Sequence, residues 1–161
     1  QGYPGEFLYV LSYTQSDESF LLGFRTQLAK KQNGELNRRL FSFDGSIKGL
    51  RNYLGVLSGA ELFIGPSTGN THMANALGVK QIALYSPIKA QSSHRWGPFR
   101  RDENVEVMVP DVANNDSLEW GEQICPTNEC MSKIEVEDVY KKVSKLLKLE
   151  NKGGSGETSK S

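Results

Sequence analysis

The chain has little of several features that mark particular classes of protein. Two cysteines among 161 residues are too few for a disulfide framework. Its 19 basic and 19 acidic residues give a formal net charge of zero, so no long-range field favours nucleic acid or an acidic membrane surface. No apolar run approaches the length that spans a bilayer. The composition therefore predicts no nucleic-acid partner and, at most, peripheral contact with a membrane.

The two ends of the sequence differ in character from its middle. The opening stretch QGYPGEFLYVLSY lacks an initiator methionine and soon becomes strand-like, which is typical of a chain that continues upstream. The closing stretch NKGGSGETSKS has no apolar residue, as in disordered tails and linkers. We therefore expect one folded domain over 1–150 and a disordered tail or linker over 151–161. Because Cys125 and Cys130 form no framework, a reduced, cytosolic setting is the default expectation.

Apolar spacing predicts an alternation of strands and helices. Strands are expected at 7–13, 38–43, 61–65, 80–86 and 104–110, and helices at 20–34, 44–60, 67–78 and 135–150. A long loop is expected after Pro87, and 111–132 reads as irregular. The alternation indicates an α/β fold with a parallel, doubly wound sheet, in which ligands bind where strands end and helices begin.

Two of the expected helices have a clear apolar face. In the helix at 44–60 this face carries Ile47, Leu50, Leu54 and Leu57. In the final helix it carries Val136, Val139, Val143, Leu146 and Leu147. Both faces are predicted to point into the core.

One segment, FIGPSTGNTHMANALGVKQIALYSP, carries the strongest functional signal. It predicts a strand, a turn with Pro66, a helix beginning near Ser67 and Thr68 and ending at Gly78, and a second strand. Unpaired N–H groups in the first helical turn, together with the helix dipole, favour an anion such as phosphate. His72 lies one turn on and could donate to the same anion. A plain helix cap with a half-buried histidine is an equally good interpretation of these residues alone.

The same segment resembles the nucleotide-sugar signature of glycosyltransferase family 9, the bacterial heptosyltransferase family. That signature is an apolar strand, D-[S/T]-G-x-x-H, an alanine-rich helix, a glycine and a second strand. The family's R-W-G-P is present as Arg95 to Pro98, and CPTNECMSKIEVEDVYKKV resembles its closing segment. The pieces follow one another in the family's order over about 7–149.

The resemblance implies one half of a two-domain GT-B enzyme. This chain would be the Rossmann-like C-terminal half, with helices on both faces of its sheet, lacking that domain's first strand and helix. The family's catalytic base lies in the absent N-terminal domain, so the catalytic residue here is unknown. The implied reaction is inverting, needs no metal or other cofactor, and uses a nucleotide-sugar such as ADP-heptose with a glycan or glycolipid acceptor.

The resemblance also assigns candidate residues for binding the nucleotide-sugar. Thr68, Gly69 and His72 occupy the positions that would face the diphosphate. Ser67 stands where the family usually has Asp, which removes a charge and places the donor sugar and catalysis in doubt. Glu18 or the preceding Asp17 would hold the ribose, unless they serve only the start of a helix.

The loop after Pro87 and the cysteines leave further alternatives. Arg95 would lie near the phosphates, and Trp96 would either shape the pocket mouth or serve in packing. The spacing of Cys125 and Cys130 from His72 and His94 does not match a zinc site, so we expect two half-buried thiols or a disulfide.

These observations favour the donor-binding domain of a cytoplasmic glycosyltransferase of lipopolysaccharide biosynthesis, at the inner face of the bacterial inner membrane. The alternatives are a non-catalytic nucleotide-binding module and another GT-B enzyme, such as a UDP-sugar epimerase-like protein. Without the base, this chain alone is expected to be inactive.

Overall fold

The computed structural model describes residues 7–30, 38–111 and 129–149. These residues belong to two compact units, Gln1–Val56 and Leu57–Ser161, which we describe separately. The expectation of a single domain over 1–150 stays a prediction, and the predicted tail at 151–161 lies outside the described residues. No helix among the described residues has both the length and the apolar character needed to cross a membrane.

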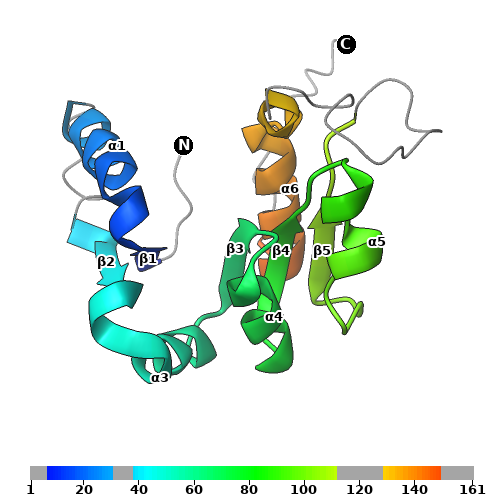
Figure 1. The fold of residues 1–161 in the computed structure, drawn as a ribbon, viewed down its shortest axis with the longest axis horizontal. Helices are drawn as coiled ribbons and strands as arrows, with labels where there is room; N and C mark the ends of the chain where they lie inside the picture. Colours follow the sequence, from blue (N-terminus) through cyan, green and yellow to red (C-terminus); the bar gives the residue numbers. More distant parts are fainter. Residues whose placement is uncertain (1–6, 31–37, 112–128, 150–161) are drawn as a thin grey trace, which may run out of the picture. The chain divides into compact units, whose positions relative to one another are not determined.

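The first unit is built on a pair of parallel strands (Figure 1). Its elements are β1 (Tyr9–Tyr13), the 3-10 turn η1 (Gln15–Asp17), α1 (Glu18–Lys30), β2 (Leu40–Asp44) and most of α3 (Gly45–Ser58). Strand β1 pairs with β2 from Tyr9 opposite Leu40 to Tyr13 opposite Asp44. The parallel connection through a helix follows the prediction from the alternating pattern.

Helix α3 departs from the predicted apolar face. Gly49 has a φ of 74°, a left-handed conformation that interrupts the helix and that glycine adopts without steric cost. The face predicted from an unbroken helix is therefore wrong in its first half, where Ile47 is 78% exposed and Leu50 is 61% exposed. After the break, Tyr53 and Leu57 are buried. The ring of Tyr53 lies 5.9 Å from that of Phe43, centroid to centroid.

The second unit contains a parallel sheet with the order β3-β4-β5. Its elements are β3 (Leu62–Pro66), α4 (Gly69–Ala76), β4 (Lys80–Leu84), η2 (Lys89–Gln91), α5 (Ser93–Trp96), β5 (Val105–Met108), η3 (Glu129–Lys133) and α6 (Val136–Leu147). Leu62 stands opposite Lys80 in the first strand pair, and Gln81 opposite Val105 in the second. With parallel strands and flanking helices in both units, the predicted α/β class is confirmed.

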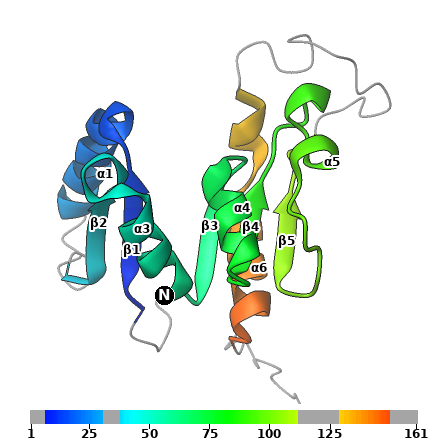
Figure 2. The same ribbon diagram turned by 60° about the horizontal axis from the view of Figure 1, so that its bottom comes forward.

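The core of this unit surrounds the central strand β4. Gln81, Ile82 and Ala83 are all fully buried, although successive strand residues point to opposite faces of a sheet. Both faces are therefore covered, and Figures 1 and 2 show α4 on one side of the sheet and α6 on the other. The Lys80 ammonium donates to the backbone carbonyl of Leu146 in α6, at 2.9 Å.

Two expectations for this unit need correction. The segment after Pro87, predicted as a loop, contains η2 and the short helix α5, because the carbonyl of Ser92 accepts from the backbone N–H groups of Arg95 and Trp96. In α6, Leu146 is buried as predicted, but Val136 is 83% exposed. Val136 is the first residue of the helix, whereas the buried residues of α6 lie in its second half.

Candidate functional site

The candidate site lies where the chain leaves β3 and enters α4. The backbone N–H of Ser67 donates to the carbonyl of Leu84 at 3.0 Å, which keeps this turn attached to the end of β4. The hydroxyl of the buried Thr71 donates to the carbonyl of Pro66 at 2.6 Å. These two bonds fix the start of α4 against the carboxyl ends of two parallel strands, the edge at which such sheets bind ligands.

The first turn of α4 is not capped by a side chain. Thr68 occupies the N-cap position in an extended conformation (φ −139°, ψ 175°), and its hydroxyl makes no capping hydrogen bond. Thr71 donates its N–H to the carbonyl of Thr68 at 3.1 Å. The N–H groups of Thr68, Gly69 and Asn70 have no acceptor in the part of the chain that the structure describes. Such unpaired donors, at the positive end of the helix dipole, can receive an anion.

This corner of the second unit is open to solvent. Thr68, Gly69 and His72 are exposed, and Ser67 is half-buried. The two glycines of the turn differ: the position beside Gly65 is filled by the ring of Phe63, whereas a side chain at Gly69 would meet only the end of Met73. Gly65 therefore serves internal packing. Gly69 leaves the backbone accessible.

Tyr85 joins this corner to α5. It lies directly after β4, is fully buried, and donates its hydroxyl to the carbonyl of Trp96 at 2.6 Å. Burial raises the pKa of Tyr85, and a hydrogen bond with Ser67 and the charge of Arg101 offset this only in part. Tyr85 therefore links the end of β4 to α5.

The residues predicted from R-W-G-P occupy distinct positions in α5. The Trp96 indole N–H donates to the carbonyl of Ala90 at 2.9 Å, which accounts for this side chain by local packing. The Arg95 guanidinium lies over the Trp96 ring, 5.3 Å from its centroid. The structure thus brings Ser67, Thr68, Gly69 and His72 together, and places Arg95 on the neighbouring α5.

Glu18 and Asp17 belong to the first unit. Glu18 is the exposed first residue of α1. The Asp17 carboxylate accepts from the N–H of Thr14 at 3.0 Å and from its hydroxyl at 2.9 Å. Both hydrogen bonds lower the pKa of Asp17, and the bond from the backbone N–H of Thr14 has the larger effect. Asp17 therefore caps the start of this helical segment, and the assignment of Glu18 to the ribose stays a prediction.

The cysteine alternatives are partly resolved. Cys130 is buried and disulfide-bonded. Cys125, the other cysteine of the chain, lies outside the described residues. Among the described residues, no group of three His, Cys, Asp or Glu side chains could hold a metal ion. That the reaction needs no metal stays a prediction.

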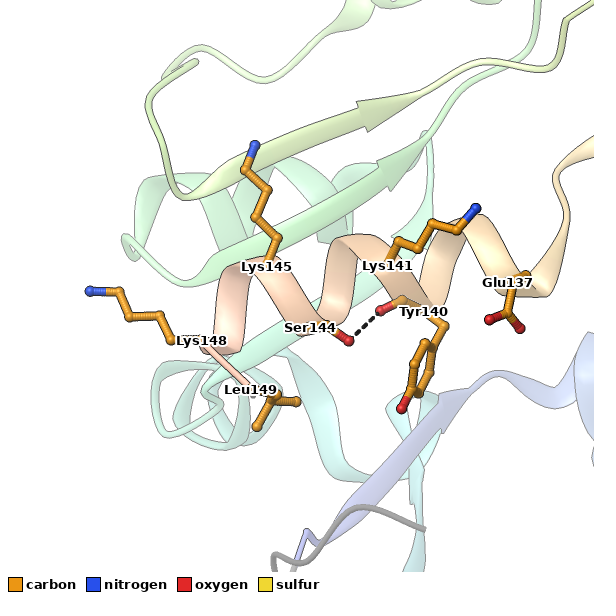
Figure 3. A pocket seen from close by; sticks show the side chains of 7 residues that line it. All are labelled: Glu137, Tyr140, Lys141, Ser144, Lys145, Lys148 and Leu149. Carbon is orange, nitrogen blue, oxygen red and sulfur yellow. Dashed lines mark hydrogen bonds between the residues drawn. The ribbon is translucent and has the colours of Figure 1, made fainter. Parts of the chain in front are cut away.

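A hollow of about 660 Å³ lies along α6 and the residues after it. Figure 3 shows its lining side chains projecting from this one segment, with the Ser144 hydroxyl donating to the Tyr140 carbonyl at 3.0 Å. The hollow is lined by Glu137, Tyr140, Lys141, Ser144, Lys145, Lys148 and Leu149. None of the residues predicted to bind the nucleotide-sugar is among them, so the hollow is separate from the candidate site.

These observations define an α/β protein with parallel sheets and an exposed, uncapped helix N-terminus at the carboxyl edge of one sheet. Residues 48–117 match the family described as glycosyltransferase family 9 (heptosyltransferase). The resemblance stated from the motifs is therefore confirmed over this segment, which is similar to glycosyltransferases of the heptosyltransferase family. No curated protein and no solved structure matched the chain. A glycosyltransferase acts on a sugar donor and an acceptor.

Sequence reasoning missed three residues that join α4, α5 and the central strand. Tyr85 looks like an ordinary strand residue, and Asn75 like an ordinary helical one. Arg101 belongs to a pair of arginines that resembles solvated surface. A buried polar residue gives no sequence signal of its own. The distances between Asn75 and Arg100, and between Tyr85 and Trp96, follow only from the fold.

Proposed function

We propose that this chain forms the nucleotide-sugar-binding domain of an inverting, metal-independent glycosyltransferase. The observation that supports this most is the exposed and uncapped first turn of α4, which lies inside the segment that matches the family. ADP-heptose is a candidate donor, and a glycan or glycolipid of the lipopolysaccharide type is the candidate acceptor. The acceptor site and the base would belong to a second domain of the same protein.

The chemistry asked of this domain is the stabilisation of a leaving group. When an acceptor hydroxyl attacks the anomeric carbon, the bond from that carbon to the nucleoside diphosphate breaks and negative charge grows on the phosphate. The N–H groups of Thr68, Gly69 and Asn70 would share that charge, with the Thr68 hydroxyl and the His72 imidazole as further donors. Donors already fixed in place stabilise such charge without reorganising.

Ser67 supports a second candidate, a nucleotide-binding module without catalysis. Its hydroxyl carries no charge, unlike the carboxylate that the family usually has there. A hydroxyl in that position keeps fewer acceptor sites than a carboxylate. Transfer of a sugar by the full-length protein would favour the enzyme, and nucleotide binding without turnover would favour the module.

Calorimetric titration of the chain with ADP, UDP, GDP and CDP tests the proposal. We expect one of the four to bind with a dissociation constant below about 1 mM, which corresponds to about 4 kcal/mol. His72→Ala should weaken that binding about tenfold, since a hydrogen bond to a charged group is lost. His94→Ala, an equally exposed histidine in α5, is the matched control. Binding of none of the four at millimolar concentration would overturn the proposal.

We also propose a cytoplasmic location at the membrane's inner face, with peripheral contact at most and no nucleic-acid partner. The disulfide at Cys130 points the other way, because structural disulfides are rare in the cytosol. Fractionation of cells that produce the full-length protein would decide between these locations.

A further inference from the structure

A stretch of positive charge runs through the part of the second unit that carries α5. Residues 86–101, which we call the basic segment, contain no acidic residue. All of its cations are exposed: Lys89, Arg95, Arg100 and Arg101. Just beyond the segment, Asp102 pairs with Arg100 at 2.8 Å, and Glu103 is exposed. The zero net charge of the whole chain therefore conceals a locally positive surface, because no carboxylate of the segment balances its cations.

The basic segment also exposes two aromatic side chains. Phe99 is 96% exposed, and Trp96 is 50% exposed. A single exposed apolar residue is ordinary on a protein surface and requires no partner. Here, however, two aromatic rings share one short stretch of chain with several cations. That combination is what a partner of this surface has to match.

The exposure of Phe99 is built into the fold, since the chain is fixed on both sides of it. Pro98, the residue before it, is buried. After it, the side-chain amide of Asn75 donates to the carbonyl of Arg100 at 3.0 Å and accepts from the N–H of Arg100 at 2.8 Å. Asn75 is itself buried within α4. The backbone therefore presents the Phe99 ring to the solvent from a fixed position.

The second aromatic residue, Trp96, is fixed as well. Its indole N–H donates to the carbonyl of Ala90 at 2.9 Å, and its own carbonyl accepts from the hydroxyl of the buried Tyr85 at 2.6 Å. The guanidinium of Arg101 donates to the carbonyl of Ser93, which places this cation against the same short helix. Because its N–H is already bonded, the Trp96 ring can enter an apolar environment without leaving a polar group unpaired.

We propose that the basic segment docks on an anionic membrane surface, with Phe99 and Trp96 entering the interface and the cations facing the lipid phosphates. The charge of the segment is complementary to anionic headgroups, and aromatic rings are favoured between headgroups and acyl chains. A soluble phosphate would pair with the cations but would leave the Phe99 ring in water. The proposal rests on the peripheral membrane contact of the proposed function and does not depend on nucleotide binding.

Sedimentation of the chain with lipid vesicles tests the proposal. Vesicles of phosphatidylglycerol and phosphatidylcholine in equal parts should bind about tenfold or more tightly than phosphatidylcholine alone, and added salt should weaken the binding. Phe99→Ala should weaken it about tenfold, since the ring no longer leaves water. Lys89→Gln and Arg101→Gln should each weaken it about fivefold through the lost charge.

Matched controls and a second measurement locate the contact. Phe20→Ala, at a phenylalanine of α1 that is 78% exposed, and Lys148→Gln, at an exposed lysine after α6, should bind vesicles like the wild type. The chain has two tryptophans, so Trp120→Phe leaves Trp96 as the only fluorophore of this kind. Lipids brominated along their acyl chains should quench its fluorescence in anionic vesicles. Thermal unfolding verifies that each variant is folded.

The outcomes separate this proposal from the nucleotide-sugar site. If the chain binds no vesicles, binds both kinds equally, or binds them equally well as Phe99→Ala, the docking surface is overturned and the nucleotide titration is unaffected. Vesicle binding without quenching of Trp96 would also overturn it. Binding of polyglutamate but not of vesicles, lost in Arg101→Gln, would assign the segment to an acidic protein instead. Vesicle binding without nucleotide binding would overturn the nucleotide-sugar site alone.

Discussion

The hydroxyl of Tyr85 and the backbone carbonyl of Trp96 form a 2.6 Å hydrogen bond beneath the surface of the second unit. Tyr85 has no exposed surface, so this bond is made away from water. It joins the end of the central strand to the short helix that carries Arg95. The turn before α4 is attached to the end of the same strand, because the Ser67 N–H donates to the carbonyl of Leu84. The arrangement of the candidate site therefore depends on this pair.

Tyr85→Phe should destabilise the second unit. The change removes the hydroxyl and leaves the Trp96 carbonyl without this donor, which typically costs about 1–2 kcal/mol. Urea unfolding measures the loss. Tyr9→Phe, at a tyrosine that is 42% exposed, should have little effect. Equal stability of the Tyr85 variant and the wild type would mean that the bond contributes nothing to stability.

Gln81→Met should stabilise the protein. Gln81 is fully buried in β4, and among the described residues neither its amide nitrogen nor its amide oxygen has a hydrogen-bond partner. Burying an unpaired polar group costs about 1–3 kcal/mol, and methionine has a similar shape without that cost. The midpoint of urea unfolding should rise, whereas Gln91→Met, at an exposed glutamine, should leave it unchanged. A fall for Gln81→Met would indicate that a bound water satisfies the amide.

Glu106 should make the free energy of unfolding depend on pH. Its carboxylate accepts from Lys142 at 2.9 Å and from Lys145 at 2.5 Å, which connects β5 to α6. Burial raises the pKa of Glu106, but the hydrogen bonds and charges of the two lysines outweigh it, so the pKa lies below its ordinary 4.5. A group with a lowered folded-state pKa stabilises the fold above its unfolded pKa and loses this effect as pH falls through the folded value.

The measurement is the unfolding free energy of wild type and Glu106→Gln at pH 7 and pH 3. At pH 7 the variant should be less stable by about 1–2 kcal/mol, between the values for exposed and buried ion pairs. At pH 3 the difference should shrink, because the wild-type carboxyl becomes protonated. Glu103→Gln, at an exposed neighbour, should show neither effect. A difference that grows toward acid would contradict the assigned sign.

Gly97→Ala should lower the stability of the protein, and Gly55→Ala should not. A methyl group at Gly97 would collide with the Arg101 guanidinium and with the Ser93 carbonyl, which belongs to the backbone and cannot easily move. At Gly55, inside α3, the same methyl meets nothing within 4 Å. Alanine there should stabilise the helix by about 0.5–1 kcal/mol. Thermal unfolding of both variants provides the comparison, and similar shifts in the two would refute this explanation of Gly97.

The disulfide at Cys130 predicts a thiol count. The chain has two cysteines, so the unfolded, unreduced protein should react with no equivalents of a thiol reagent. After reduction it should react with two. Two reactive thiols before reduction, in protein purified under oxidising conditions, would show that the cysteines are free and would restore the expectation of a reduced setting.

Local sequence patterns determined much of this protein. Alternating strand and helix periods predicted the parallel α/β class, because those periods are properties of neighbouring residues. Gly78 was also predicted to stop this helix, and its φ of 73°, two residues after the end of α4 at Ala76, explains why glycine is there. The P-S-T-G-x-x-H segment indicated the family, since its residues lie close together in the sequence.

The tertiary structure decided which side chains meet. Asn75 and Arg100 are 25 positions apart, and no periodicity connects them. Some predicted core residues are exposed, because burial depends on packing partners as well as on spacing. They lie next to the break at Gly49 in α3 and at Val136, the first residue of α6. The Arg101 guanidinium lies against α5 only because Gly97 has no side chain. The sequence set the elements, whose geometry is local, and folding set the contacts, which join residues distant along the chain.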